Sequence, residues 1–90
     1  MITATTKVIN KTGLHARPAS IFVKKAKEFQ SEIQVRNVDK ESPFVSAKSI
    51  LRLLTAELCM GNTVEIQADG ADEAEAVKAL VDLINTGFGE

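Results

Sequence analysis

The chain has 90 residues, 44% of them hydrophobic and 26% charged, which is enough for one small domain with a two-layer core. Eleven basic and twelve acidic residues give a net charge of −1, which excludes the broad basic field of most nucleic-acid-binding domains. One histidine and one cysteine exclude a Cys/His zinc site and an intramolecular disulfide.

No apolar run reaches the roughly 20 residues of a membrane span, and no signal peptide is visible. We therefore expect a cytoplasmic protein without metal, other cofactor, nucleic-acid partner or membrane insertion.

The first third of the chain predicts a strand followed by a helix. Apolar and polar residues alternate over Ile2–Ile9, which is typical of a strand, and Asn10–Gly13 has the composition of a turn. From Leu14 to Gln30 apolar residues recur at helical spacing opposite charged ones, and Pro18 suits the first turn of such a helix. The expected buried face comprises Ala16, Ala19, Phe22, Val23, Ala26 and Phe29.

The middle of the chain predicts two strands and a short helix. Alternation over Ile33–Val38 indicates a second strand, Asp39–Pro43 is a polar loop, and Phe44–Ser46 suggests a short third strand. A short helix is expected over Ser49–Leu58, with the hydroxyl of Ser49 as its N-cap.

The last third predicts a strand and a helix. Val64, Ile66 and Ala68 alternate with polar residues, and Asp72 with Glu75 resembles a capping box at a helix start. The expected buried face of that helix comprises Ala74, Val77, Leu80, Val81 and Ile84, and Gly87 and Gly89 would end the helix. The order β-α-β-β-α-β-α predicts an α+β fold with helices on one face of an antiparallel sheet.

His15 is the candidate reactive residue because it stands between a glycine turn and the start of a helix. The first N–H groups of a helix lack intrahelical partners, and with the helix dipole they favour an anion. Arg17 can place its guanidinium fork on phosphate oxygens, and a neutral imidazole is a nucleophile. These residues fit the binding of a phosphoryl group, although a histidine before a helix is more often an ordinary loop residue.

The segment Gly13-Leu14-His15-Ala16-Arg17-Pro18-Ala19-Ser20 resembles the active-centre signature of the HPr family, the histidine phosphocarriers of the bacterial phosphoenolpyruvate:sugar phosphotransferase system. Ala47-Lys48-Ser49-Ile50-Leu51 resembles the family's second motif, around a regulatory serine. The resemblance runs on through Gly61 and the Gly70–Glu73 helix start. It implies one HPr-like domain over residues 1–90, folded as an open-faced β-sandwich with a four-stranded antiparallel sheet and three helices on one side.

The resemblance also implies a stoichiometric phosphocarrier rather than an enzyme, expected to be a monomer. His15 would accept a phosphoryl group on Nδ1 from phosphorylated enzyme I and pass it to IIA domains of sugar permeases. Arg17 would assist, and the backbone at Ala16 and Arg17 would hold the phosphate. Ser49 would be the target of an HPr kinase/phosphorylase, with a catabolite-control transcription factor as a further partner. Helix capping alone explains a serine at this position equally well.

The short helix carries more apolar residues than one buried stripe needs. Leu53 and Leu58 are expected in the core, whereas the other apolar residues fall on a second face beside His15. Such exposed patches usually mark a partner surface, although some of these residues could belong to the core. In the family, the outer faces of the first helix and of this short helix bind enzyme I, IIA domains and regulators. Basic residues on these faces would complement acidic partners. The predicted surface comprises Ile21, Lys24, Lys27, Lys48, Ile50, Leu51, Arg52 and Leu54.

The chain departs from the family pattern in the loop Asn37–Phe44, which is longer than usual, in Thr55–Glu57, where a glycine is common, and at Arg52, where the residue is often small. These departures leave open a regulatory module for carbon or nitrogen control, acting through phospho-Ser49 or through the phosphorylation state of His15. A third reading is an acylphosphatase-like hydrolase that uses Arg17 and Asn10. Cys59 is expected to be a small hydrophobic residue near the end of the short helix, without a redox partner.

Overall fold

The computed structural model describes residues 1–90 and has the predicted order of elements. Its strands form one four-stranded antiparallel sheet in the order β1-β4-β2-β3. The strands are β1 (Ile2–Lys7), β2 (Glu32–Asn37), β3 (Val45–Ser46) and β4 (Thr63–Asp69). The helices are α1 (Ala16–Ala26), α2 (Ile50–Thr55) and α3 (Glu73–Asn85), followed by the 3-10 turn η1 (Gly87–Gly89). The predicted α+β open-faced sandwich is thereby confirmed.

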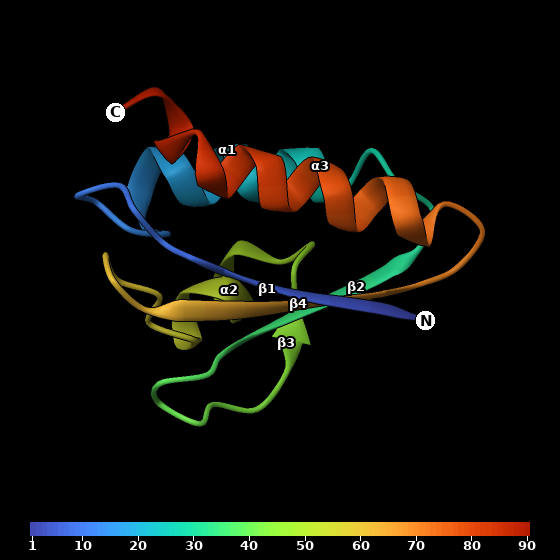
Figure 1. Ribbon diagram of the computed structural model, residues 1–90, viewed down its shortest axis with the longest axis horizontal. Coiled ribbons are helices and arrows are strands. Elements are labelled where there is room, and N and C mark those ends of the chain that lie inside the picture. The colour runs from blue at the N-terminus through green and yellow to red at the C-terminus, as the bar shows by residue number, and fades with distance from the viewer.

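The sheet buries the face that its alternating sequence predicts. The central strand β4 pairs Ile66 with Ala4 on one side and with Val35 on the other, and its residues Val64, Ile66 and Ala68 are fully buried. Helices α1 and α3 run along one side of the sheet (Figure 1), and α2 adds Leu53 to the same core of 20 buried hydrophobic residues. None of the helices is both long and apolar enough to cross a membrane.

Several expectations about the helices are wrong. The first helix ends at Ala26 instead of continuing to Gln30, because the chain beyond it is held elsewhere: Lys48 Nζ donates to the carbonyl of Phe29 at 2.7 Å. Phe29 is therefore only partly buried, and Ala16, at the other end of the helix, is exposed.

At the last helix, Ala74 is exposed and Ala76 takes its place in the buried face. The predicted capping box is absent, since the Asp72 side chain makes no cap hydrogen bond. The register of α3 is thus set by its packing on the sheet and not by a box with Glu75.

Asp72 instead joins the start of α3 to the segment after α1. Its carboxylate accepts hydrogen bonds from the N–H of Gln30 at 2.8 Å, from the N–H of Ser31 at 2.9 Å and from the Ser31 hydroxyl. The hydroxyl of Ser31, followed by the N–H of Gln30, lowers the pKa of Asp72 below its ordinary value of 3.8. These bonds favour the ionised carboxylate in the folded state.

We expect Asp72→Asn to lower the free energy of unfolding more at pH 7 than at pH 3. The folded pKa of Asp72 is depressed, so its contribution is complete above about pH 5 and is lost as the pH falls through the folded pKa, below 3.8. Urea unfolding of the variant and the parent at both pH values measures this. Asp82→Asn is the control, because Asp82 pairs only with the exposed Lys78 and should matter little at either pH. An equal loss at both pH values would contradict the prediction.

Candidate functional site

His15 stands at the N-cap of α1, where the chain leaves the turn after β1. Its backbone is extended (φ −130°, ψ 163°), and its side chain makes no cap hydrogen bond. No acidic residue lies in the first turn of α1. The positive end of the helix dipole and the first N–H groups are therefore free to act on an anion beside the histidine ring.

The turn that delivers His15 is packed directly on the segment after α2. Gly13 has φ +69°, and a Cβ at this position would lie 2.5 Å from the carbonyl oxygen of Leu58. The N–H of the next residue, Leu14, donates to that same oxygen at 2.8 Å, and the Leu14 side chain is buried. Two chain segments far apart in sequence thus meet through their backbones, and this contact fixes the place of His15.

The first helical residue is held in an unusual conformation. Ala16 has φ 50°, in the left-handed region that costs a residue with a side chain about 1 to 2 kcal/mol. Pro18, two positions later in the first turn of α1, is buried and its ring fixes its own φ. Local backbone strain of this kind tends to persist at functional sites, where the surrounding structure holds it in place.

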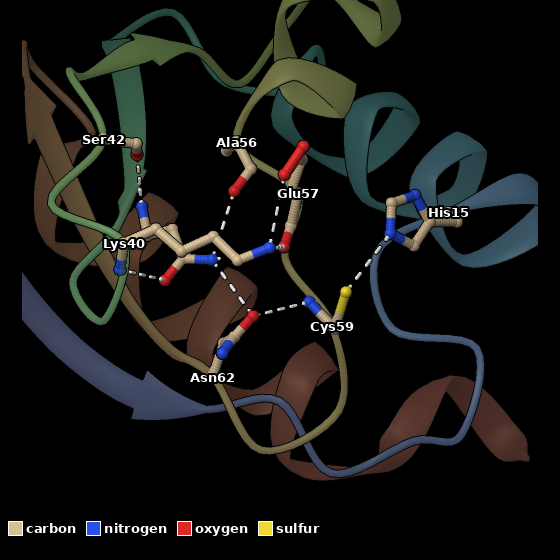
Figure 2. A network of polar contacts seen from close by, with 8 residues as sticks. His15, Lys40, Ser42, Ala56, Glu57, Cys59 and Asn62 are labelled. Carbon is tan, nitrogen blue, oxygen red and sulfur yellow. Dashed lines mark hydrogen bonds and ion pairs between the residues drawn. The ribbon is translucent and has the colours of Figure 1, made fainter.

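Cys59, expected as a small hydrophobic residue near the end of the short helix, lies beside His15. It is exposed, and its Sγ is 3.9 Å from Nε2 of His15 (Figure 2). No periodicity in the sequence signals this contact, since it joins two loops 44 residues apart. The only local indication of this contact is Gly13, because the absence of a Cβ lets its backbone approach that of Leu58 and Cys59.

The carboxylate of Glu90 is a second feature that the sequence did not reveal. It accepts hydrogen bonds from the Asn10 amide at 3.0 Å, from the Thr12 N–H at 3.3 Å and from the Thr12 hydroxyl at 2.9 Å. The bond from Asn10 and then that from the Thr12 hydroxyl lower the pKa of Glu90, and the nearby charge of Arg17 acts in the same direction. The chain end therefore closes over the turn after β1.

An open hollow of about 640 Å³ lies beside this contact, lined by Ile9, Asn10, Lys11, Thr12, Met60 and Glu90. Asn10 is only 4% exposed, and its amide donates to the carbonyl of Gly13 as well as to Glu90. An amide engaged in this way is not free to bind a substrate, which disfavours the hydrolase reading that relied on Asn10.

The apolar surface on α2 is exposed as predicted. Leu51 is 80% exposed, Ile50 44% and Leu54 36%, while Leu53 and Leu58 are buried. Ile21 is half-buried on α1. Of the basic residues expected around this surface, Arg17, Lys24, Lys27 and Arg52 are exposed.

Lys48 is the exception, because it is half-buried and its ammonium is bound to the carbonyl of Phe29. Ser49 caps α2 as predicted: its Oγ accepts from the N–H of Arg52 at 3.3 Å. The exposed cations and the α2 surface thus lie on α1, which begins after His15, and on α2, whose following segment contacts the His15 ring. Lys48 instead joins the α2 start to the segment after α1.

The chain resembles proteins of one family over nearly its whole length. Residues 2–86 match the PTS-HPr family model, described as the PTS HPr component phosphorylation site. The chain is 44% identical over 90 residues to the phosphocarrier protein HPr of Neisseria meningitidis serogroup A, which covers 100% of this chain and 98% of the relative.

The structural comparisons agree. The crystal structure of HPr from Thermoanaerobacter tengcongensis superposes with a TM-score of 0.93 at 49% identity, covering 100% of this chain and 98% of the other. A structure of Crh from Bacillus subtilis, described as a catabolite repression protein and a domain-swapped dimer, superposes with a TM-score of 0.73 at 36% identity over 97% of both chains.

Proposed function

The chain belongs to the HPr family of phosphocarrier proteins of the phosphotransferase system, and we propose that His15 is the residue that carries the phosphoryl group. The observation that supports this most is the place of His15 at the uncapped, positive end of α1. We infer that residues 1–90 act as a single domain. It would receive the phosphoryl group from phosphorylated enzyme I and deliver it to IIA domains of sugar permeases.

The chemistry requires little more than this one ring. Nδ1 of His15 attacks phosphorus, and the bond between phosphorus and the donor's atom breaks as the new N–P bond forms. The proton on Nε2 stays in place, so the phosphorylated ring carries a positive charge beside the phosphoryl dianion. The N–H groups of Ala16 and Arg17, together with the α1 dipole, face the incoming oxygens and stabilise their charge.

Incubation with phosphoenolpyruvate and enzyme I tests this function. We expect the intact mass to rise by one phosphoryl group, the group to be labile in acid, and peptide mapping to place it on the segment that holds His15. An acid-stable product, or no product, would contradict the proposal. Purified IIA domains should then remove the group.

Arg17→Ala is expected to lower the rate of phosphoryl transfer about 100-fold, since a charge-assisted donor to the transferring oxygens is lost. Arg17→Lys should lose less, because the ammonium keeps the charge but not the guanidinium fork. A time course of phosphorylation with limiting enzyme I, quenched at set times, measures both rates. Arg36→Ala is the control, because Arg36 is paired with Glu65 on the sheet. Equal rates for Arg17→Ala and the parent would exclude a role for the guanidinium.

The exposed face of α2 is the proposed docking surface for these partners. Leu51, Ile50 and Leu54 offer exposed apolar area on α2, and the exposed Arg52, Lys24 and Lys27 supply positive charge on α2 and α1. Apolar contact supplies affinity, and complementary charge speeds the encounter with an acidic partner. The half-buried Ile21 would extend this surface onto α1, whereas Lys48 contributes less because its ammonium is engaged.

Regulation through Ser49 is a second candidate function, favoured by the likeness to Crh and by the place of the serine at the start of α2. A phosphate there would add about −1.5 to −2 charge within the docking surface. It would stay compatible with the helix start while repelling an acidic partner. An HPr kinase/phosphorylase with ATP should give an acid-stable product that Ser49→Ala lacks, and absence of any product would contradict this role and a catabolite-control partner that reads it.

A further inference from the structure

A chain of polar contacts connects the end of β2 with the segment that faces His15. Asn37 is 0% exposed, and its Nδ2 donates to the carbonyls of Ala56 at 3.1 Å and Glu57 at 3.2 Å and to Oδ1 of Asn62 at 3.0 Å. The same Oδ1 of Asn62 accepts from the N–H of Cys59 at 2.9 Å. The two asparagines therefore hold the segment from Ala56 to Asn62 at both of its ends and, through Cys59, in its middle.

The long loop after β2 reinforces the same segment from outside. The N–H of Lys40 donates to Oδ1 of Asn37 at 3.2 Å, and Lys40 Nζ reaches the carbonyl of Glu57 at 3.2 Å and its carboxylate at 3.3 Å (Figure 2). Glu57 has φ 50°, a conformation that a residue with a side chain adopts only when its surroundings hold it there. Both polar groups of the buried Asn37 are thus satisfied, which makes the network rigid.

At its far end this network touches one edge of the His15 ring. The thiol of Cys59 lies 3.9 Å from Nε2, and Figure 2 shows the other ring nitrogen on the side of the ring away from the sulfur. No side chain or carbonyl of the protein makes a hydrogen bond with Nδ1. The χ2 torsion of histidine has a broad distribution, so a contact on one edge can bias the orientation of the ring.

We propose that Asn37 and Asn62 are positioning residues that decide which nitrogen of His15 takes the phosphoryl group. They fix the segment from Ala56 to Asn62, so that the Cys59 side chain covers Nε2 and leaves Nδ1 open. Nε2 keeps its proton facing sulfur, while the Nδ1 lone pair forms the N–P bond and the bond from phosphorus to the donor breaks. This inference rests on the proposed function of His15 and adds to it the residues that select the atom.

Phosphoramidate tests the selection without any partner protein. His15 attacks its phosphorus, the P–N bond breaks and ammonia leaves, and phosphorus NMR then distinguishes the Nδ1 and Nε2 products. Asn62→Ala removes the acceptor of two hydrogen bonds, of which the one from Cys59 bears directly on the thiol. We expect the ratio of Nε2 to Nδ1 product to rise about fivefold over the parent, the size of one net hydrogen bond. Asn62→Asp should keep the parent ratio, because both bonds to residue 62 need only its acceptor oxygen.

The matched control is Asn85→Ala, since Oδ1 of Asn85 also accepts a side-chain hydrogen bond, from Thr6 at 2.6 Å, but takes no part in the Asn37–Asn62 network. An unchanged ratio in a folded Asn62→Ala variant overturns the proposal. If that variant does not fold, Cys59→Ala removes the thiol and keeps both asparagines, and an unchanged ratio there overturns it equally. Failure of enzyme I to label His15 would instead overturn the proposed function, because the phosphoramidate ratio does not depend on enzyme I.

Discussion

His15→Ala is expected to remove all acid-labile phosphorylation by phosphoenolpyruvate and enzyme I. His15 is the only histidine of the chain, so no second imidazole can take its place as the nucleophile. The variant should remain folded, because the His15 side chain is partly exposed and makes no cap hydrogen bond. Such a substitution changes the free energy of unfolding by about 0.5 kcal/mol or less. Intact mass before and after acid treatment, together with an unfolding curve, measures both effects.

Ser49→Ala is the control for this experiment, since it removes the other proposed phosphorylation site and should keep full acid-labile labelling. Phosphate that persists in His15→Ala and maps to Cys59 or Ser49 would show that His15 is not the sole acceptor. Labelling of Cys59 is the alternative to check first, because its thiol contacts the His15 ring and is itself a nucleophile.

The sequence predicts well the parts of the fold that follow from a repeating pattern. The alternation of Val64, Ile66 and Ala68 marks a strand buried in the middle of a sheet, and each of the three is fully buried. The surplus of apolar residues in α2 predicts its exposed face for the same reason, since one short helix cannot bury both Leu53 and Leu51. Periodicity states which face of an element is buried. The structure confirms this for β4 and α2, whereas Ala16 and Ala74, in the first turns of α1 and α3, are exposed.

Periodicity does not state which loops meet. Asn37, Asn62 and Cys59 come from three loops or strand ends, and their contacts with one another and with His15 exist only once the sheet is assembled. Asp72 shows the same limit. Its local sequence favours a capping box, but its carboxylate instead accepts three hydrogen bonds from the Gln30–Ser31 segment. The local sequence therefore predicts His15 as the phosphoryl acceptor, but it does not predict that Asn37, Asn62 and Cys59 orient the ring.

Gly13→Ala is expected to lower the free energy of unfolding by about 2 to 5 kcal/mol. The left-handed conformation at φ +69° costs a residue with a side chain about 1 to 2 kcal/mol. The new methyl group would also lie 2.5 Å from the Leu58 carbonyl oxygen and 2.9 Å from Cα of Cys59, and overpacking of this kind costs about 1 to 3 kcal/mol. Both neighbours are backbone atoms, so no side chain can turn aside to make room. Urea unfolding followed by circular dichroism measures the loss.

Gly61→Ala separates the two causes. Gly61 also has a positive φ, +93°, but a Cβ there has no heavy atom within 4 Å, so only the conformational penalty remains. The extra loss in Gly13→Ala therefore reports the contact between the His15 turn and the Leu58–Cys59 segment. Gly13→Ala should also slow phosphoryl transfer, because the new methyl group pushes the His15 turn away from the Cys59 thiol that covers Nε2. Gly61→Ala should leave the transfer rate unchanged, because it does not move this turn. Equal stability and equal transfer rates in the two variants would mean that this backbone contact neither holds the fold nor places the ring.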